Sequence, residues 1–419
     1  MVDSNLPATG ERILLRLMHF LYNTGILLLG VGIRVYALFN EKTKRWVEGR
    51  KNWEAKLPKV NSDEVVWFHC ASLGEFDQGL PLMWKFRHEK PDCCILVTFF
   101  SPSGMEHYHK RKHPADIVQY LPLDTPSNAR KFVSHFNPKY FCLIKYEFWS
   151  NFIFEAKKQG AKVYNVSGIF RKNHRFFRPY GAFFRSTLRA FDWFFVQNEE
   201  SVELLQSIGI ENYSIVGDSR YDKVYQTRKN HIPNEIIANF CGDHRVFIVG
   251  SSWPKDEEII LPVINKLNCK VIIAPHNIDS KSIKGITSNL SRKFSRFTDG
   301  NVPESSEVLI LDTIGHLSSA YSFGSIAYVG GGFTGNLHNI LEPAVFGMGV
   351  MFGPKFEKYP EASSFIKNGF GFDVSTSDEV KYRIEYVLEN REVINTKAAQ
   401  FVEDSRGASE KMYTQITAN

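Results

Sequence analysis

The sequence has no long run of lysine and arginine, no cysteine pair spaced C-x-x-C, no internal repeat and no low-complexity segment. Without a basic run, the net charge of +6 indicates affinity for anionic surfaces or substrates rather than a nucleic-acid-binding tail. Six cysteines lack the spacing of metal ligands, and all except Cys241 lie in or beside apolar runs. We therefore expect reduced thiols in a reducing compartment for Cys70, Cys93, Cys94, Cys142, Cys241 and Cys269.

The chain of 419 residues is long enough for two domains, and its pattern repeats in two halves. Short apolar runs alternate with amphipathic stretches, which is typical of parallel sheets covered by helices on both faces. A polar link near 225–236 separates the two series. We expect an α/β fold of two Rossmann-like, doubly wound domains, with strands at 65–71, 93–100, 116–123, 140–146, 161–167, 193–198 and 213–217, then 246–252, 270–276, 307–313, 325–332, 349–354 and 369–374.

Residues 17–33 form one apolar run, which basic residues flank on both sides. Arg12 and Arg16 precede it, and Arg34, Lys42 and Lys44 follow it. The run is short for a spanning helix, which needs about 20 apolar residues. Three interpretations remain: a marginal transmembrane anchor, a helix lying in the membrane interface, or a buried helix of the first domain. The flanking charges favour membrane contact.

The segment 326–344, IAYVGGGFTGNLHNILEPA, combines a short strand, three glycines and an expected helix start. Asn339 is a candidate N-cap, and Glu342 follows three residues later. Glycine allows close approach of the backbone to a ligand, and a helix N-terminus favours an anion, so a nucleotide phosphate would fit here. The alternative is a tight strand-to-helix turn that binds nothing.

Several segments, taken in order, resemble the Kdo (3-deoxy-D-manno-octulosonic acid) transferases of lipopolysaccharide biosynthesis, glycosyltransferase family 30. The resemblance covers nearly the whole chain. The matching stretches are WFHCASLGEFDQGLPL (67–82), YLPLDTPSNARKF (120–132), YEFWSN (146–151), VSGIFRKNHRFFRPY (166–180), VGDSRYDKV (216–224), VGSSWPKDEEII (249–260), APHNID (274–279), DTIGHLSSAYSFGSIAYVGGGF (312–333) and HNILEPAVFGMGVMFGP (338–354).

The resemblance implies a GT-B glycosyltransferase, with two domains facing across a cleft, that needs no metal or other cofactor. It implies CMP-Kdo as donor, a lipid A precursor as acceptor, and a place on the cytoplasmic face of the inner membrane. We accordingly divide the chain into a membrane-associated segment (1–45), an acceptor-binding domain (46–228) and a CMP-sugar-binding domain (229–419).

The sequence departs from the family pattern at four places. Tyr146 stands where the family has Thr, Arg220 where it has Lys, and His276 where it has Arg. The run 336–339, Asn-Leu-His-Asn, replaces Gly-Gly-His-Asn. These changes suggest a divergent branch of the family.

Glu75 is the residue that the resemblance assigns as general base, at the end of the first strand. The alternative is a first-turn glutamate that stabilises its helix. Glu147 is the second candidate base, or a ligand of the substrate. The other expected substrate-binding residues are Ser72, Gly74, Asn151, Arg171, Arg175 and Arg220, although a lone arginine such as Arg220 is usually a solvated surface residue. For the nucleotide we expect Gly250, Ser251, Ser252, Pro275, His276, Gly330, Gly331, Gly332, His338, Asn339 and Glu342, the last on the ribose.

Residues 169–189 interleave arginines with phenylalanine and tyrosine. This composition fits an acylated, phosphorylated acceptor at a membrane surface better than single-stranded nucleic acid. A solvated basic helix over a core stripe remains an alternative. For the whole chain, the rival hypotheses are another GT-B nucleotide-sugar enzyme, such as a UDP-GlcNAc epimerase, and a membrane-attached binding protein without catalysis.

Overall fold

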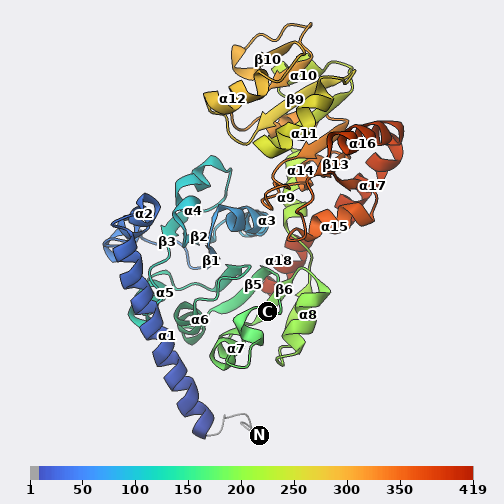
Figure 1. The fold of residues 1–419 in the computed structure, drawn as a ribbon. Helices are drawn as coiled ribbons and strands as arrows, with labels where there is room; N and C mark the ends of the chain where they lie inside the picture. Colours follow the sequence, from blue (N-terminus) through green and yellow to red (C-terminus); the bar gives the residue numbers. More distant parts are fainter. Residues whose placement is uncertain (1–8, 419) are drawn as a thin grey trace. The chain divides into compact units, whose positions relative to one another are not determined.

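The computed structural model describes residues 9–418, and Figure 1 shows their fold. These residues divide into two compact units. Unit 1 contains the chain up to residue 223 together with the residues from 407 onward, and unit 2 contains 224–406. The first eight residues of the expected membrane segment, 1–45, lie outside the described part of the chain.

Unit 1 is built on a parallel seven-stranded sheet in the order β3-β2-β1-β4-β5-β6-β7. Every apolar run expected in this half of the chain forms one of its strands. They are β1 (Val65–Cys70), β2 (Cys94–Phe99), β3 (Ile117–Tyr120), β4 (Tyr140–Ile144), β5 (Lys162–Gly168), β6 (Trp193–Val196) and β7 (Tyr213–Ile215).

Helices cover both faces of this sheet, as the doubly wound prediction requires. One core layer packs under α5, α6, α7 and α8. The other core layer packs under α3 and the last helix, α18. The helices are α1 (Thr9–Tyr36), α2 (Glu41–Gly49), α3 (Leu73–Glu89), α4 (Pro102–His107), α5 (Pro126–Phe136), α6 (Ser150–Lys158), α7 (Ala182–Leu188), α8 (Glu199–Gln206), α9 (Arg220–Lys229) and α18 (Ala408–Ala418), with short 3-10 turns at η1 (Glu54–Lys56), η2 (Tyr108–Lys110) and η3 (Arg175–Phe177).

Unit 2 repeats the plan with a parallel sheet in the order β10-β11-β9-β8-β12-β13-β14. Its strands are β8 (Val246–Ser252), β9 (Lys270–Pro275), β10 (Phe294–Arg296), β11 (Val308–Ile310), β12 (Ile326–Val329), β13 (Gly349–Phe352) and β14 (Gly371–Asp373). Its helices are α10 (Glu235–Cys241), α11 (Pro254–Ile264), α12 (Ser280–Thr287), α13 (Leu317–Tyr321), α14 (Leu341–Val345), α15 (Pro360–Lys367), α16 (Ser377–Glu389) and α17 (Arg391–Ser405), with a 3-10 turn at η4 (Phe297–Asp299).

Two local expectations for unit 2 were incomplete. The edge strand β10 was not expected, because it has three residues and only its central Ser295 is buried. Cys241, which the sequence placed outside the apolar runs, is buried in the unit 2 core at the end of α10. The helix is too short to show its apolar face as a pattern.

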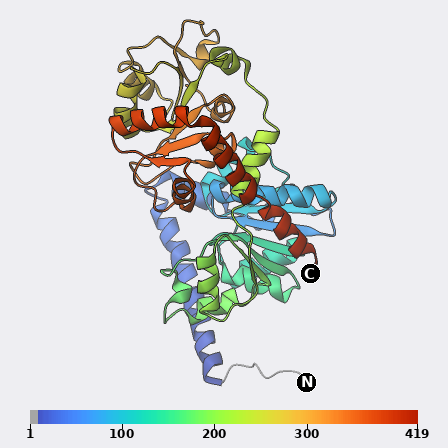
Figure 2. The same cartoon turned by 90° about the vertical axis from the view of Figure 1, so that its right-hand side faces the viewer.

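The division between the units differs from the expected boundary at 228 and 229. It falls within α9, which the sequence suggested as part of a polar link. In addition, α18 returns to unit 1 and lies along α3 (Figure 2). Between the two helices Lys85 pairs with Glu410 at 2.6 Å and Phe86 packs on Tyr413. Met412 and Ile416 are fully buried in the unit 1 core. No local pattern in the sequence indicates which sheet a terminal helix covers.

Helix α1 docks on unit 1 through a stripe of polar and aromatic side chains. The Tyr22 hydroxyl donates to Asp124 at 2.5 Å, and the Asn151 amide bonds Asn23 at 2.9 Å and His19 at 3.0 Å. Ile26 completes the stripe and is 7% exposed. The spacing of these residues places them on one helix face. The docking therefore uses the polar side of a largely apolar helix.

The opposite face of α1 carries exposed leucine, phenylalanine and valine side chains. Phe20 is 66% exposed and Leu28 is 65% exposed. Within Arg16–Tyr36, which is long and apolar enough to cross a membrane, only 11% of the apolar window is buried. This low burial contradicts the interpretation of the segment as a buried helix of the first domain.

Candidate active site

Glu75 lies in the first turn of α3, directly beyond the carboxyl end of β1. Its carboxylate accepts a short hydrogen bond from the backbone N–H of Ala71. Burial raises the pKa of Glu75 to about 7, and the negative charge of Glu147 adds to the rise. A carboxyl group with this pKa can exchange a proton near neutral pH, as a general base requires. The same contact with Ala71 also caps the helix, so both sequence interpretations have a structural basis.

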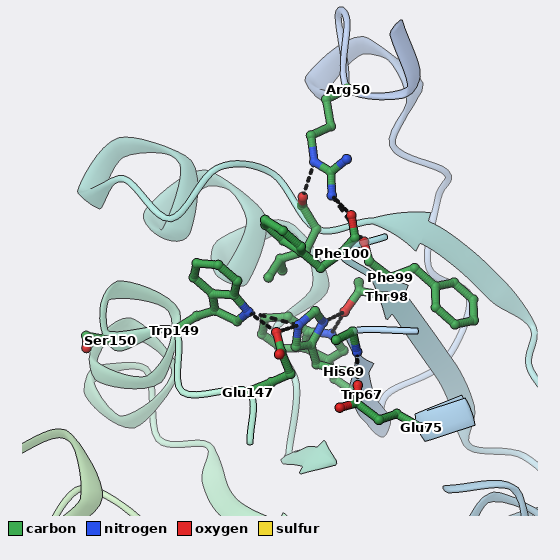
Figure 3. Close-up of polar contacts among 12 residues, drawn as sticks. Arg50, Trp67, His69, Glu75, Thr98, Phe99, Phe100, Glu147, Trp149 and Ser150 are labelled. Atoms are coloured by element: carbon green, nitrogen blue, oxygen red, sulfur yellow. Dashed lines mark hydrogen bonds and ion pairs between the residues drawn. The ribbon is translucent and has the colours of Figure 1, made fainter. Parts of the chain in front are cut away.

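Glu147 is held by a polar network that extends from the end of β4 to β1 and β2 (Figure 3). Trp149 donates its indole N–H to the Glu147 carboxylate at 2.7 Å, and His69 Nε2 lies 3.3 Å from the same oxygen. The other ring nitrogen of His69 lies 2.9 Å from Thr98 Oγ1, which also accepts the Trp67 indole N–H at 2.8 Å.

The indole N–H of Trp149 also lies 3.0 Å from Nε2 of His69, so it is shared between the imidazole and the Glu147 carboxylate. Thr98 Oγ1 in turn contacts both Nδ1 of His69 and the indole N–H of Trp67. His69 is fully buried, so this network fixes the position of the Glu147 carboxylate rather than exchanging with solvent.

Arg50 supports the same edge of the sheet from the end of α2. Its guanidinium donates to the carbonyl oxygens of Leu121 and Phe100, both at 2.7 Å. It also lies 3.7 Å from the Trp46 ring centroid. Phe100 in turn stacks on Trp149, with ring centroids 4.7 Å apart. The residues that follow the apolar segment are thereby tied to the network around Glu147.

Tyr146 lies near several charged side chains. Burial raises its pKa, while the positive charges of Arg171 and Arg220 lower it and Glu75 raises it. Arg220 is itself held by Asp218, with Nη2 and Oδ2 2.6 Å apart. The structure thus brings Glu75, Glu147, Arg171 and Arg220 of the predicted set to one edge of the unit 1 sheet.

Two neighbouring residues have left-handed backbone conformations that only glycine adopts easily. Lys145 has φ 56° after β4, and Ser167 has φ 54° within β5. Strained residues of this kind gather at functional sites. The sequence did not single out either residue, nor His69 and Thr98, because all four lie in or next to apolar strand runs and there look like core.

The remaining predicted residues of unit 1 divide into two groups. Ser72 is the N-cap of α3 without a side-chain cap bond, and Gly74 is exposed with open space around it. Both lie beside Glu75. By contrast, the Asn151 amide is occupied in docking α1, and Arg175 packs its guanidinium 4.7 Å from the Phe184 ring. Asn151 is therefore engaged with α1.

In unit 2, the predicted glycines pack against the protein chain itself. A side chain on Gly330 would meet the Ser251 carbonyl at 2.2 Å, and one on Gly331, at φ 95°, would meet the Asn336 carbonyl at 2.1 Å. Gly250 and Gly332 are equally crowded, by Tyr321 and Gly353. These glycines are explained by a tight turn, the alternative that the sequence left open, without any ligand.

The expected N-cap at Asn339 is wrong. Helix α14 begins at Leu341 with Ile340 as N-cap and has only five residues, so it provides little dipole for an anion. Asn339 instead accepts the Leu341 N–H at 3.1 Å and donates to Glu342 at 3.1 Å. Its short side chain competes for the backbone just outside the helix.

A ring cluster occupies the carboxyl edge of the unit 2 sheet. Trp253 stacks on His276 with centroids 4.1 Å apart, and its indole N–H donates to His338 Nε2 at 3.1 Å. Burial and then the charge of His276 lower the pKa of His338 to about 4, so its ring is neutral at pH 7. Pro275 precedes this cluster at the end of β9.

The loop that carries Trp253 is organised by two further polar groups. The buried Asp256 carboxylate accepts the N–H groups of Trp253 at 2.8 Å and Gly331 at 3.0 Å. Ser252 donates its hydroxyl to Glu257 at 2.9 Å, and Ser251 has φ 54°. Sequence reasoning missed Trp253 and Asp256, although Trp253 directly follows the predicted serines.

These groups lie at the carboxyl edges of two parallel sheets, and the class that the fold defines is GT-B-like α/β. A crystal structure of a Listeria monocytogenes protein described as a UDP-N-acetylglucosamine 2-epimerase superposes with a TM-score of 0.59 at 12% identity, over 86% of this chain and 96% of that one. A glycosyltransferase from Rickettsia africae superposes at 0.52 and 12% identity, over 86% of this chain and 100% of that one. These likenesses concern the fold alone.

The sequence comparisons find similarity to Kdo transferases. Residues 44–223 match the family described as 3-deoxy-D-manno-octulosonic-acid transferase (Kdo transferase). The Kdo transferase of Chlamydophila psittaci is 28% identical over 391 residues, 88% of this chain and 90% of the relative. That of Aquifex aeolicus is 27% identical over 358 residues, 83% and 92% of the two chains. Over most of its length the chain is therefore similar to Kdo transferases, as the resemblance predicted.

Proposed function

We propose that this protein transfers Kdo from CMP-Kdo to lipid IVA, a lipid A precursor, with inversion and without a metal or other cofactor. The observation that carries the proposal is Glu75, a half-buried carboxylate with a pKa of about 7 at the carboxyl edge of a Kdo transferase domain. The similarity to Kdo transferases supports Kdo transfer in lipopolysaccharide synthesis.

In the proposed reaction, Glu75 takes the proton from an acceptor hydroxyl while the oxygen bonds to the anomeric carbon of Kdo. The bond from that carbon to the phosphate oxygen of CMP breaks, and its electron pair leaves with the phosphate. Glu147 keeps the pKa of Glu75 high enough for this transfer. Arg171 and Arg220 supply positive potential near the same edge, where the Kdo carboxylate and acceptor phosphates need it.

The nucleotide is proposed to bind on unit 2, at the carboxyl edge of its sheet. The neutral rings of Trp253, His276 and His338 offer a stacking surface for cytosine. Glu342 remains the proposed ribose ligand. The tight packing of Gly330–Gly332 gives these glycines a role in shaping the loop.

We further propose that α1 lies in the interface at the cytoplasmic face of the inner membrane. Its docking contacts extend from His19 to Gly30, which stands against Leu123. That stretch is about 17 Å of helix, roughly half of a bilayer core. If α1 spanned the bilayer while docked on unit 1, the polar surface of unit 1 would have to enter the hydrocarbon core. An in-plane helix instead presents Phe20 and Leu28 to the lipid.

The test is transfer from CMP-Kdo, generated in situ, to a tetraacylated lipid A precursor, with EDTA present and the product measured by mass spectrometry. A product heavier by one or more Kdo residues is expected. If no product forms while the folded protein binds CMP, the donor or acceptor is wrong, and another nucleotide-sugar reaction on the same fold would replace the proposal.

A further inference from the structure

Unit 1 has an arginine-lined hollow of about 520 Å³ between η3, α7 and the end of α8. We call it the arginine hollow. Its walls carry Arg178, Arg185 and Arg189, together with Ser207 and Ile208. Three guanidinium groups on one concave surface provide strong, directional donors for a phosphate.

The central arginine of the hollow is held in place by the protein. Arg185 Nη1 donates to the carbonyl oxygens of Phe176 and Arg178, both at 3.0 Å. Arg178 and Arg189 are exposed on either side of it. Among the carboxylates of residues 9–418, none forms an ion pair with these three arginines. The hollow therefore has an excess of positive charge that no described acidic group neutralises.

The topology separates the arginine hollow from the group around Glu75. Glu75 follows the carboxyl end of β1. Arg189 precedes the first residue of β6, and Ser207 lies in the turn that leads to β7. Because all seven strands are parallel, Arg189 and Ser207 lie at the edge of the sheet opposite to Glu75. The hollow is thus a second cationic site.

The hollow is lined by α7, a helix that lies beside α1 (Figure 1). The two helices pack through Phe183, whose ring lies 5.1 Å from Tyr22 and 5.8 Å from His19. Tyr180, next to the hollow in the chain, is 67% exposed. Exposed tyrosine beside arginine is typical of the headgroup level of a bilayer.

We propose that the arginine hollow binds the phosphate of an anionic membrane lipid headgroup while the apolar face of α1 rests in the same leaflet. The proposal uses the membrane contact of α1 proposed above and adds a phosphate ligand away from the reacting atoms. Arg185 provides a fixed fork, and Arg178 and Arg189 close on the phosphate from both sides.

The experiment measures how the full chain, purified in detergent and diluted below its critical concentration, partitions onto vesicles. Zwitterionic phosphatidylcholine vesicles report the α1 contact alone, and vesicles with phosphatidylglycerol report the added headgroup contact. The test variant is R178Q/R189Q, which leaves Arg185 and its carbonyl contacts intact. The control is K266Q/K284Q, which removes the same charge from exposed positions of unit 2.

We expect wild type and both variants to bind zwitterionic vesicles equally. On anionic vesicles, R178Q/R189Q should lose on the order of 25-fold in partition, from about fivefold per arginine near a charged surface. The control should lose less than about twofold, since charges beyond a Debye length are screened. If both variants lost binding to anionic vesicles equally, net charge alone would explain the loss. That result would overturn the proposal.

Two further outcomes would also overturn it. If millimolar inorganic phosphate abolishes the anionic increment, the hollow takes a soluble phosphate rather than a headgroup. If wild type shows no anionic increment while it binds zwitterionic vesicles, the α1 contact stands and the hollow has no lipid ligand. Failure on both kinds of vesicle would instead contradict the membrane contact itself, which keeps the two proposals separable.

Discussion

The indole N–H of Trp149 donates a 2.7 Å hydrogen bond to the carboxylate of Glu147, the same carboxylate whose charge raises the pKa of Glu75. Two acidic residues 72 positions apart in the chain are thereby coupled through a fixed geometry. Glu147 lies against Trp149 and His69, and Glu75 accepts the backbone N–H of Ala71. Because the two carboxylates have different environments, one can accept a proton while the other raises the pKa of that acceptor.

Glu75→Gln should abolish Kdo transfer, by at least about 100-fold in kcat, because a positioned general base contributes 10²–10⁴. CMP binding by unit 2 should survive, which calorimetry measures beside the activity assay. Glu89→Gln, at the exposed end of the same helix, is the matched control and should be active. Loss of CMP binding together with unfolding of Glu75→Gln would show that the carboxylate only caps α3.

The rate of transfer should depend on pH through Glu75. A base works when deprotonated, so kcat/KM should fall tenfold per pH unit below about 7 and level off above it. Glu147→Gln removes a negative charge that favours the protonated form, so the midpoint should move to lower pH. Burial, the larger cause, remains in the variant. An unchanged midpoint would exclude coupling between the two carboxyl groups.

Tyr22→Phe should loosen α1, since the lost hydroxyl leaves the buried Asp124 with only backbone donors from α6. The expected cost is about 1–3 kcal/mol of unfolding free energy, measured by urea denaturation of the full chain in detergent. Tyr36→Phe on the same helix is the control, because Tyr36 is 58% exposed. Equal stability of the two variants would argue against a docked α1.

Leu28→Ser and Ile26→Ser should have opposite effects, although they lie two residues apart on α1. Leu28 is 65% exposed, so its substitution should weaken binding to neutral vesicles and leave stability unchanged. Ile26 is 7% exposed, so its substitution should lower the denaturation midpoint. Vesicle flotation and thermal denaturation measure the two effects. If Leu28→Ser changed stability instead, its face would be a protein contact.

The sequence predicted the two sheets well, because buried parallel strands appear as uninterrupted apolar runs such as VVWFHC and VFIVGSS. It missed β10, which has one buried residue, and the docking of α18, which depends on long-range packing. Within the candidate site, Glu75 and Glu147 stood out as carboxylates after strands. His69 and Trp253 did not, because a buried imidazole and an indole match core patterns until their partners are known.

Asn151 and the glycines of unit 2 show a second limit of sequence reasoning. A motif shows that a certain residue is needed at a position. It does not show whether a ligand or the protein chain itself needs that residue. The Asn151 amide is required by α1, and Gly331 by the carbonyl of Asn336. Both residues are explained by contacts within the protein chain. In the sequence alone, each of them looks like a residue that binds a ligand.

The return of α18 to unit 1 has a consequence for how the protein is made. The core layer above β1 includes Ala408, Met412 and Ile416, which the ribosome delivers after all of unit 2. The core of unit 1 therefore lacks α18 while more than 180 residues of unit 2 are translated. During that interval α1, which precedes both sheets in the chain, has already been translated. If α1 contacts the bilayer as proposed, that contact can form before α18 completes the core of unit 1.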